Sequence, residues 1–187
     1  MKNIYISGRA VILPGALCPD PSDYLQELPA RFGRFDLYTK TCFSAAVLAL
    51  SCAGMLGRKG NESTGITVGS RTGVFDNDRS FFETTLEENG SFASPNLFSY
   101  TLPNVALGEI AVYFQFKGPS FCVGNDPDNP GREALNTSIC LLESGLCKNV
   151  LTGWSEISMG AAFAVLSMDD GSGKKELLTG DNLWQSY

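Results

Sequence analysis

The chain has 187 residues, of which 43% are hydrophobic and 18% charged, so wholesale disorder is excluded and one globular domain over 1–187 is expected. Its net charge of −6 leaves no basic stripe to neutralise phosphates, which argues against nucleic-acid and anionic-membrane partners. The sequence contains no histidine, which excludes Ser-His-Asp catalysis, Cys-His catalysis and any metal site that includes histidine.

The cysteine pattern indicates a reduced, cytoplasmic protein. The six cysteines are scattered, without a C-x-x-C pair, and most lie in apolar runs where a free thiol behaves as a small buried hydrophobe. Arg9 interrupts the apolar N-terminus and no cleavage-site pattern follows, so no signal peptide is expected. No run approaches 18 uninterrupted apolar residues, so no membrane span is expected.

The first half of the chain predicts strands that alternate with helices. A β-rich opening over 2–7, continued by the apolar residues 10–13, predicts the first strand and its turn. Four prolines limit 14–36 to a short helix over 21–28. The run 37–56 is apolar nearly all round, which is typical of a buried helix. A strand is expected over 64–70, and then a helix over 76–88 with Asp76 as its N-cap.

The second half continues this alternation. Pro103 suits the first turn of a helix that runs to residue 116, and a strand over 120–124 follows. Pro130 opens a helix to Leu146, with an expected inward stripe of Ala134, Ile139, Leu142 and Leu146. The last strands are expected over 149–154, 161–168 and 176–179, the closing pair around Gly171 running antiparallel. This alternation predicts an α/β sandwich with a largely parallel sheet.

Residues 94–120 read SPNLFSYTLPNVALGEIAVYFQFKGPS and carry the most informative motif. Ser94-Pro95, Asn104, Gly108 and Gly118-Pro119-Ser120 have the order and spacing of the β-ketoacyl synthases, the condensing enzymes of fatty-acid and polyketide assembly, which this segment resembles. The likeness covers most of 1–168 and includes Arg31-Phe32-x-Arg34 and the run from Glu143 to Glu156, where Trp154 replaces the second glycine of the family pattern. It implies a thiolase-like half-fold, a mixed, mostly parallel five-stranded sheet with helices on both faces.

The resemblance also implies where the chemistry should lie. In that family the strand after Gly-Pro-Ser ends at a nucleophilic cysteine at the mouth of a buried helix, and two histidines come from a second half. Condensation needs the thiolate and donors that stabilise an oxyanion. Counting from Gly118 with one inserted residue, the nucleophile position falls at Pro127 or Asp128, and neither can serve. Cys122 and Cys140 are expected to be core thiols, so no catalytic residue is predicted.

Two further groups of residues are candidates for function. The loop Asp126-Pro127-Asp128-Asn129 could offer oxygen ligands to a cation, but its prolines favour a rigid helix-capping turn, so neither a metal nor a cofactor is expected. In the family, the region of Phe98, Tyr100 and Asn104 lies near the dimer contact and the acyl pocket, so these residues are expected to contact a partner or an acyl chain, and residues 113–116 are expected in the core.

The resemblance implies a ketosynthase-like pseudoenzyme, an accessory or chain-length-factor-like subunit in bacterial fatty-acid, polyketide or aryl-polyene-type biosynthesis. It would form a homodimer, or a heterodimer with a full-length ketosynthase, and would meet acyl carrier protein only indirectly. Two alternatives stay open at this point. One is a small module that binds an acyl ligand or another protein. The other is an enzyme that uses Asp126 or Asp128 as acid or base in the former nucleophile pocket.

Overall fold

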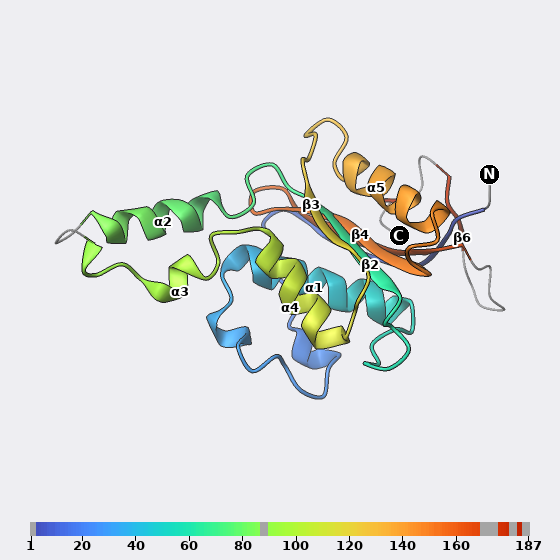
Figure 1. Cartoon of the computed structure of the whole chain (residues 1–187), viewed down its shortest axis with the longest axis horizontal. Coiled ribbons are helices and arrows are strands. Elements are labelled where there is room, and N and C mark those ends of the chain that lie inside the picture. The colour runs from blue at the N-terminus through green and yellow to red at the C-terminus, as the bar shows by residue number, and fades with distance from the viewer. Residues whose placement is uncertain (1–2, 87–89, 169–175, 180–182, 185–187) are drawn as a thin grey trace.

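A six-stranded mixed sheet forms the centre of the molecule (Figure 1). The computed structural model describes residues 3–86, 90–168, 176–179 and 183–184. The strands are β1 (Tyr5–Ile12), β2 (Thr64–Gly69), β3 (Ser120–Val123), β4 (Asn149–Glu156), β5 (Gly160–Ser167) and β6 (Glu176–Leu177), in the spatial order β3-β2-β4-β5-β1-β6. Strand β2 pairs parallel with β3 and β4, whereas β4–β5, β5–β1 and β1–β6 are antiparallel pairs. Strands β1 to β4 therefore all run in one direction.

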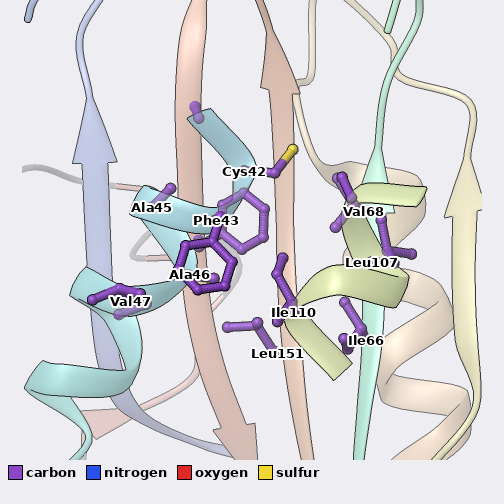
Figure 2. Close-up of a cluster of buried hydrophobic side chains, with 14 of the residues drawn as sticks. Cys42, Phe43, Ala45, Ala46, Val47, Ile66, Val68, Leu107, Ile110 and Leu151 are labelled. Atoms are coloured by element: carbon purple, nitrogen blue, oxygen red, sulfur yellow. The ribbon is translucent and has the colours of Figure 1, made fainter. Parts of the chain in front are cut away.

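Two helices cover one face of the sheet. Helix α1 (Leu37–Cys52) packs on β1 and β5, and α4 (Asn104–Phe114) lies beside it. Asp36 caps α1 by accepting the Thr39 N–H at 3.0 Å. The predicted burial of this helix is confirmed, because 11 of its 16 residues are buried. Figure 2 shows Phe43 of α1 and Ile110 of α4 meeting over the sheet residue Leu151.

Helix α5 (Arg132–Glu143) covers the opposite face. Beneath it lies a second, smaller core, which consists of Ile4, Ile6, Leu141, Leu142, Cys147, Val150, Ala164, Leu166 and Leu183. A buried hydroxyl network joins α5 to the sheet, since Thr67 of β2 contacts the Ser138 hydroxyl at 2.6 Å and the Thr152 hydroxyl at 3.1 Å. The Thr67 hydroxyl also donates to the Ala134 carbonyl at 3.0 Å.

Helices α2 (Phe75–Thr85) and α3 (Pro95–Phe98) project from the body as an arm (Figure 1). We call residues 75–86 and 90–102 the arm. Helix α2 contains no buried residue, so it takes almost no part in the core. Within the arm, the Phe81 and Phe98 rings lie 5.3 Å apart between centroids.

The predicted fold class is confirmed, with six strands instead of five. The expectation for the closing strands was wrong: β5 and β6 do not pair with each other, because β1 lies between them and is antiparallel to both. Gly171 lies outside the described residues. The last strand covers only Glu176–Leu177 of the expected 176–179.

Several expected helices differ in extent. In place of a helix over 21–28 there is a 3₁₀ turn, Pro21–Asp23, because Asp20 caps a local turn by accepting the Ser22 N–H; a second turn, Phe32–Arg34, follows. Helix α2 begins at Phe75, so Asp76 is not its N-cap and lies in the first turn, where its charge suits the helix dipole. The end of the expected helix, 87–89, lies outside the described residues.

The expectation that one apolar stripe of α5, from Ala134 to Leu146, faces the sheet was partly wrong. Ala134 and Leu142 are buried, but Leu146 is 63% exposed because α5 ends at Glu143. Cys140 was expected in the core and is exposed, since it lies on the side of α5 that faces away from the sheet.

Candidate functional site

The carboxyl ends of the three parallel strands gather a polar cluster at one edge of the sheet. Strand β2 leads into Ser70 and Arg71, β3 leads into Asn125, and β4 ends at Glu156. Parallel strands present their carboxyl ends together, and this edge is where α/β sheets usually place their ligands. The cluster therefore occupies the position at which a functional site is expected.

Glu156 is the centre of this cluster. Its side chain is 3% exposed and accepts hydrogen bonds from the Arg71 N–H, from the Thr72 N–H at 3.2 Å, from the Thr72 hydroxyl at 2.7 Å and from the Asn125 amide at 3.1 Å. Burial by itself would raise the pKa of Glu156, but the hydrogen bonds from Thr72, Arg71 and Asn125 outweigh it and hold the pKa below its ordinary value. The carboxylate is consequently ionised and held in place. Its hydrogen bonds connect the residues that follow β2 and β3 to the end of β4.

Asn125 connects this cluster to the start of α5. Its side-chain oxygen accepts the Gly131 N–H at 2.9 Å while its amide donates to Glu156. The loop between β3 and α5 is thereby held at both ends. Sequence reasoning did not single out Asn125 or Thr72, although a polar residue directly after a parallel strand is a usable signal.

The residues predicted at the nucleophile position lie on an exposed turn. Asp126 organises this turn, because its carboxylate accepts the Asp128 N–H at 3.0 Å and the Asn129 amide at 3.3 Å. Pro127 and Asp128 are both exposed. This is the geometry of an Asx turn, in which the aspartate bonds to the backbone two residues on. The Asp126 carboxylate is thus engaged within its own loop.

The start of α5 is occupied by aromatic rings. Gly131 has φ +81, and a Cβ atom built there would lie 2.7 Å from Trp154 and 2.6 Å from Trp184. Only glycine fits this backbone conformation and this close approach. Trp154, which replaces a glycine of the family pattern, and Trp184 are the two tryptophans of the chain, and both pack at this one point.

The thiols of Cys122 and Cys42 belong to β3 and α1. Cys122 is within β3, partly buried, and burial raises its pKa, as expected for a neutral thiol. Cys42 of α1 is fully buried, and burial raises its pKa to about 12. A thiol that acts as a nucleophile needs a lowered pKa, so neither environment activates its sulfur.

The three residues expected to contact a partner or an acyl chain are not brought together. Phe98 is 62% exposed on the arm, and Asn104 is exposed at the start of α4. Tyr100 is 1% exposed and packs beside Phe35, with ring centroids 6.0 Å apart, so it cannot form a surface contact in this conformation. The expected core position of 113–116 holds for Phe114 and Phe116.

A cavity of about 290 Å³ adjoins the Glu156 cluster at the base of the arm. Ser70, Arg71, Thr72, Asp78 and Thr101 give it a polar lining, and Phe75 and Pro103 contribute apolar surface. Burial raises the pKa of Asp78. Across the described part of the chain, no group of three or more metal-ligating side chains comes together. None of the helices in that same part is long and apolar enough to cross a membrane.

Comparison with known proteins decides the family. Residues 3–167 match the model of the β-ketoacyl synthase N-terminal domain. The chain belongs to the β-ketoacyl synthase family. A comparison with curated proteins found no match.

Solved ketosynthases share the fold. The AntDE:AntF complex, a type II PKS acyl-carrier protein with its ketosynthase bound to the hexaketide, matches 89% of this chain and 62% of its own, with TM-score 0.71 and 17% identity. The ishigamide ketosynthase/chain length factor matches 89% of this chain and 58% of its own, with TM-score 0.72 and 14% identity. This chain thus spans about three fifths of the length of those chains.

A third ketosynthase structure differs in relative length. The ketosynthase ApeO in complex with its chain length factor ApeC, from Xenorhabdus doucetiae, matches 91% of this chain and 81% of its own, with TM-score 0.63 and 13% identity. Because the two covered shares are similar, the matched chain of that complex is close to this one in length. At such identities the likeness is one of fold.

Proposed function

We propose that this chain is a non-catalytic subunit that assembles with a full-length ketosynthase, in the manner of a chain length factor, in bacterial fatty-acid, polyketide or aryl-polyene-type biosynthesis. The observation that carries the proposal is the start of α5. Where the family places a cysteine, this chain has an outward Pro127-Asp128 turn, and Trp154 and Trp184 fill the space against Gly131. The sequence also lacks the histidines that would polarise an acyl thioester.

The arm provides the surface for such a partner. Six large apolar side chains of the arm are each 60–65% exposed: Phe75, Phe82, Leu86, Phe92, Phe98 and Leu102. Large exposed apolar side chains on a projecting element usually mark a contact with another protein. Helix α2 buries no residue in this chain, and a partner that covers it would bury its exposed rings Phe75 and Phe82.

The relatives support the same kind of assembly. The structures reported above include a ketosynthase/chain length factor and a ketosynthase in complex with its chain length factor. The chain matched in the latter is similar in length to this chain. In the proposed assembly, a full-length ketosynthase would supply the cysteine and histidines that this chain lacks.

Co-expression with a full-length ketosynthase from the same genome tests the proposal. We expect a stable complex in size-exclusion chromatography with light scattering. Phe82→Asp should weaken it at least about tenfold, because a charge is placed in the apolar contact. Leu146→Asp is the matched control, since Leu146 is 63% exposed and Phe82 60% exposed, but Leu146 lies beyond the end of α5. Absence of a complex with every such ketosynthase would contradict the proposal.

The two enzymatic or ligand-binding alternatives are separated by mass spectrometry of the purified chain after incubation with acyl thioesters. We expect neither a covalent adduct nor retained acyl ligand. An acyl group on any cysteine would favour an enzyme, and retained ligand without an adduct would favour an acyl-binding module. The hydrogen bonds that hold the Asp126 carboxylate within its own turn argue against its service as an acid or base.

A further inference from the structure

Helix α5 presents a polar stripe to solvent along its whole length. Arg132, Glu133, Asn136, Cys140 and Glu143 are its exposed residues. Arg132, Asn136, Cys140 and Glu143 follow one another at intervals of three or four residues, so they lie on one side of the helix. The opposite side buries Ala134, Ser138, Leu141 and Leu142 against the sheet.

The core beneath α5 is closed by residues from the far end of the chain. Leu183 is 2% exposed and belongs to the same core as Leu141 and Leu142. Trp184 packs at the edge of this core and against Gly131, at the amino end of the helix. Together these two residues cover apolar surface that α5 alone leaves open.

From this arrangement we infer that Leu183 and Trp184 complete the core beneath α5, and that the exposed face of α5 stays in solvent when the chain assembles with its partner. We call this covering of the core by Leu183 and Trp184 the closure. Three of its five exposed residues carry charge, and taking unpaired charges out of water is costly. Six exposed large apolar side chains lie instead on the arm, which projects from the body away from α5 (Figure 1). The inference rests on the proposed function for its partner, but the closure by Trp184 is a property of this chain alone.

The closure can be measured without any partner by tryptophan fluorescence. Trp154 and Trp184 are the only tryptophans of the chain, and both pack against Gly131. Trp184→Ala should shift the remaining Trp154 emission to longer wavelength and lower Tm by at least about 4 °C, since a ring that covers the core is lost. Trp184→Phe keeps an aromatic ring and should retain most of Tm and a blue-shifted Trp154. An unchanged Trp154 spectrum and Tm in Trp184→Ala would overturn the closure.

A second experiment locates the surface that the partner covers. Cys140 and Cys52 are the exposed thiols among the described residues. In the Cys52→Ser chain, a bulky polyethylene-glycol maleimide attached to Cys140 should leave the affinity for the ketosynthase within about twofold. The comparison chain carries Cys52→Ser, Cys140→Ser and Phe98→Cys, so that the same group is attached at position 98 on the arm. There it should weaken the affinity at least about tenfold. Loss of binding caused by the Cys140 adduct would overturn the inference. Absence of any binding before labelling would instead refute the proposed function, and the fluorescence result would still decide the closure.

Discussion

Glu156 joins three loops through one carboxylate, so its charge should contribute to stability in a pH-dependent way. Its pKa in the folded chain lies below the ordinary glutamate value of about 4.5. A group with a depressed folded pKa stabilises the fold above its unfolded pKa and loses that contribution as the pH falls through the folded pKa. We therefore expect Glu156→Gln to be less stable than the wild type by about 1–3 kcal/mol at pH 7.

Urea titrations at pH 7 and at pH 3.5 measure this effect. The difference between wild type and Glu156→Gln should be largest at pH 7 and should shrink at the lower pH, because below the ordinary value of about 4.5 the unfolded chain takes up a proton at Glu156 more readily than the folded chain. A difference that is equal at both pH values would mean that the ionised state of Glu156 does not stabilise the fold.

Gly131 provides a second test at the level of one residue. Gly131→Ala forces a Cβ atom into a positive-φ backbone and into the two indole rings, so we expect a loss of about 2–4 kcal/mol. Gly145→Ala is the matched control, because Gly145 has φ +74 and nothing lies within 4 Å of its Cβ position. Equal losses in the two variants, measured by chemical denaturation, would show that the contact with the rings has no cost.

At the level of elements, α5 is fixed to the sheet by buried hydroxyls as well as by apolar contacts. Thr67→Val removes the hydroxyl that contacts Ser138 at 2.6 Å and Thr152 at 3.1 Å, so we expect destabilisation by about 1–3 kcal/mol, because the remaining buried hydroxyls lose a partner. Adding Ser138→Ala should cost less than its single effect predicts. A double-mutant cycle measures this coupling, and strict additivity would indicate that the two hydroxyls do not interact.

Element types could be predicted from the sequence wherever the local pattern and the tertiary environment agree. The 37–56 run is apolar on all sides and forms the buried helix α1, because sheet, α4 and loops surround it. Gly118 of the Gly-Pro-Ser motif is explained by the same packing, since a Cβ atom there would lie 2.6 Å from the Thr64 carbonyl oxygen. Where two backbones approach this closely, the sequence has a glycine, and that glycine can be recognised from the sequence alone.

Features that depend on distant segments could not be predicted in this way. The exposure of Cys140 and the burial of Tyr100 depend on where α5 and the Phe35 loop lie, and residue type alone does not report that. Asp126 was recognised as part of a turn, but its connection through Asn125 to Glu156 joins residues about 30 positions apart. The contact of Trp184 with Gly131 spans a still longer separation.

For the whole molecule, the six exposed apolar side chains of the arm predict how it associates. With the arm uncovered, the chain alone should self-associate as its concentration rises, because apolar surface drives contact. Phe82→Asp combined with Phe98→Asp should remove this tendency, whereas Leu17→Asp, at a residue 95% exposed and outside the arm, should not. Sedimentation velocity over a range of concentrations measures the effect, and association that persists in the double variant would place the contact elsewhere.

The position of β1 has a consequence for how the chain is made. Its neighbours in the sheet are β5 and β6, which lie more than 140 residues later in the chain and are therefore synthesised later. Until then its backbone groups have no strand to pair with, and loops that long form slowly. Nascent chains that end before residue 167 should therefore expose β1 as an unpaired strand, which is prone to aggregation.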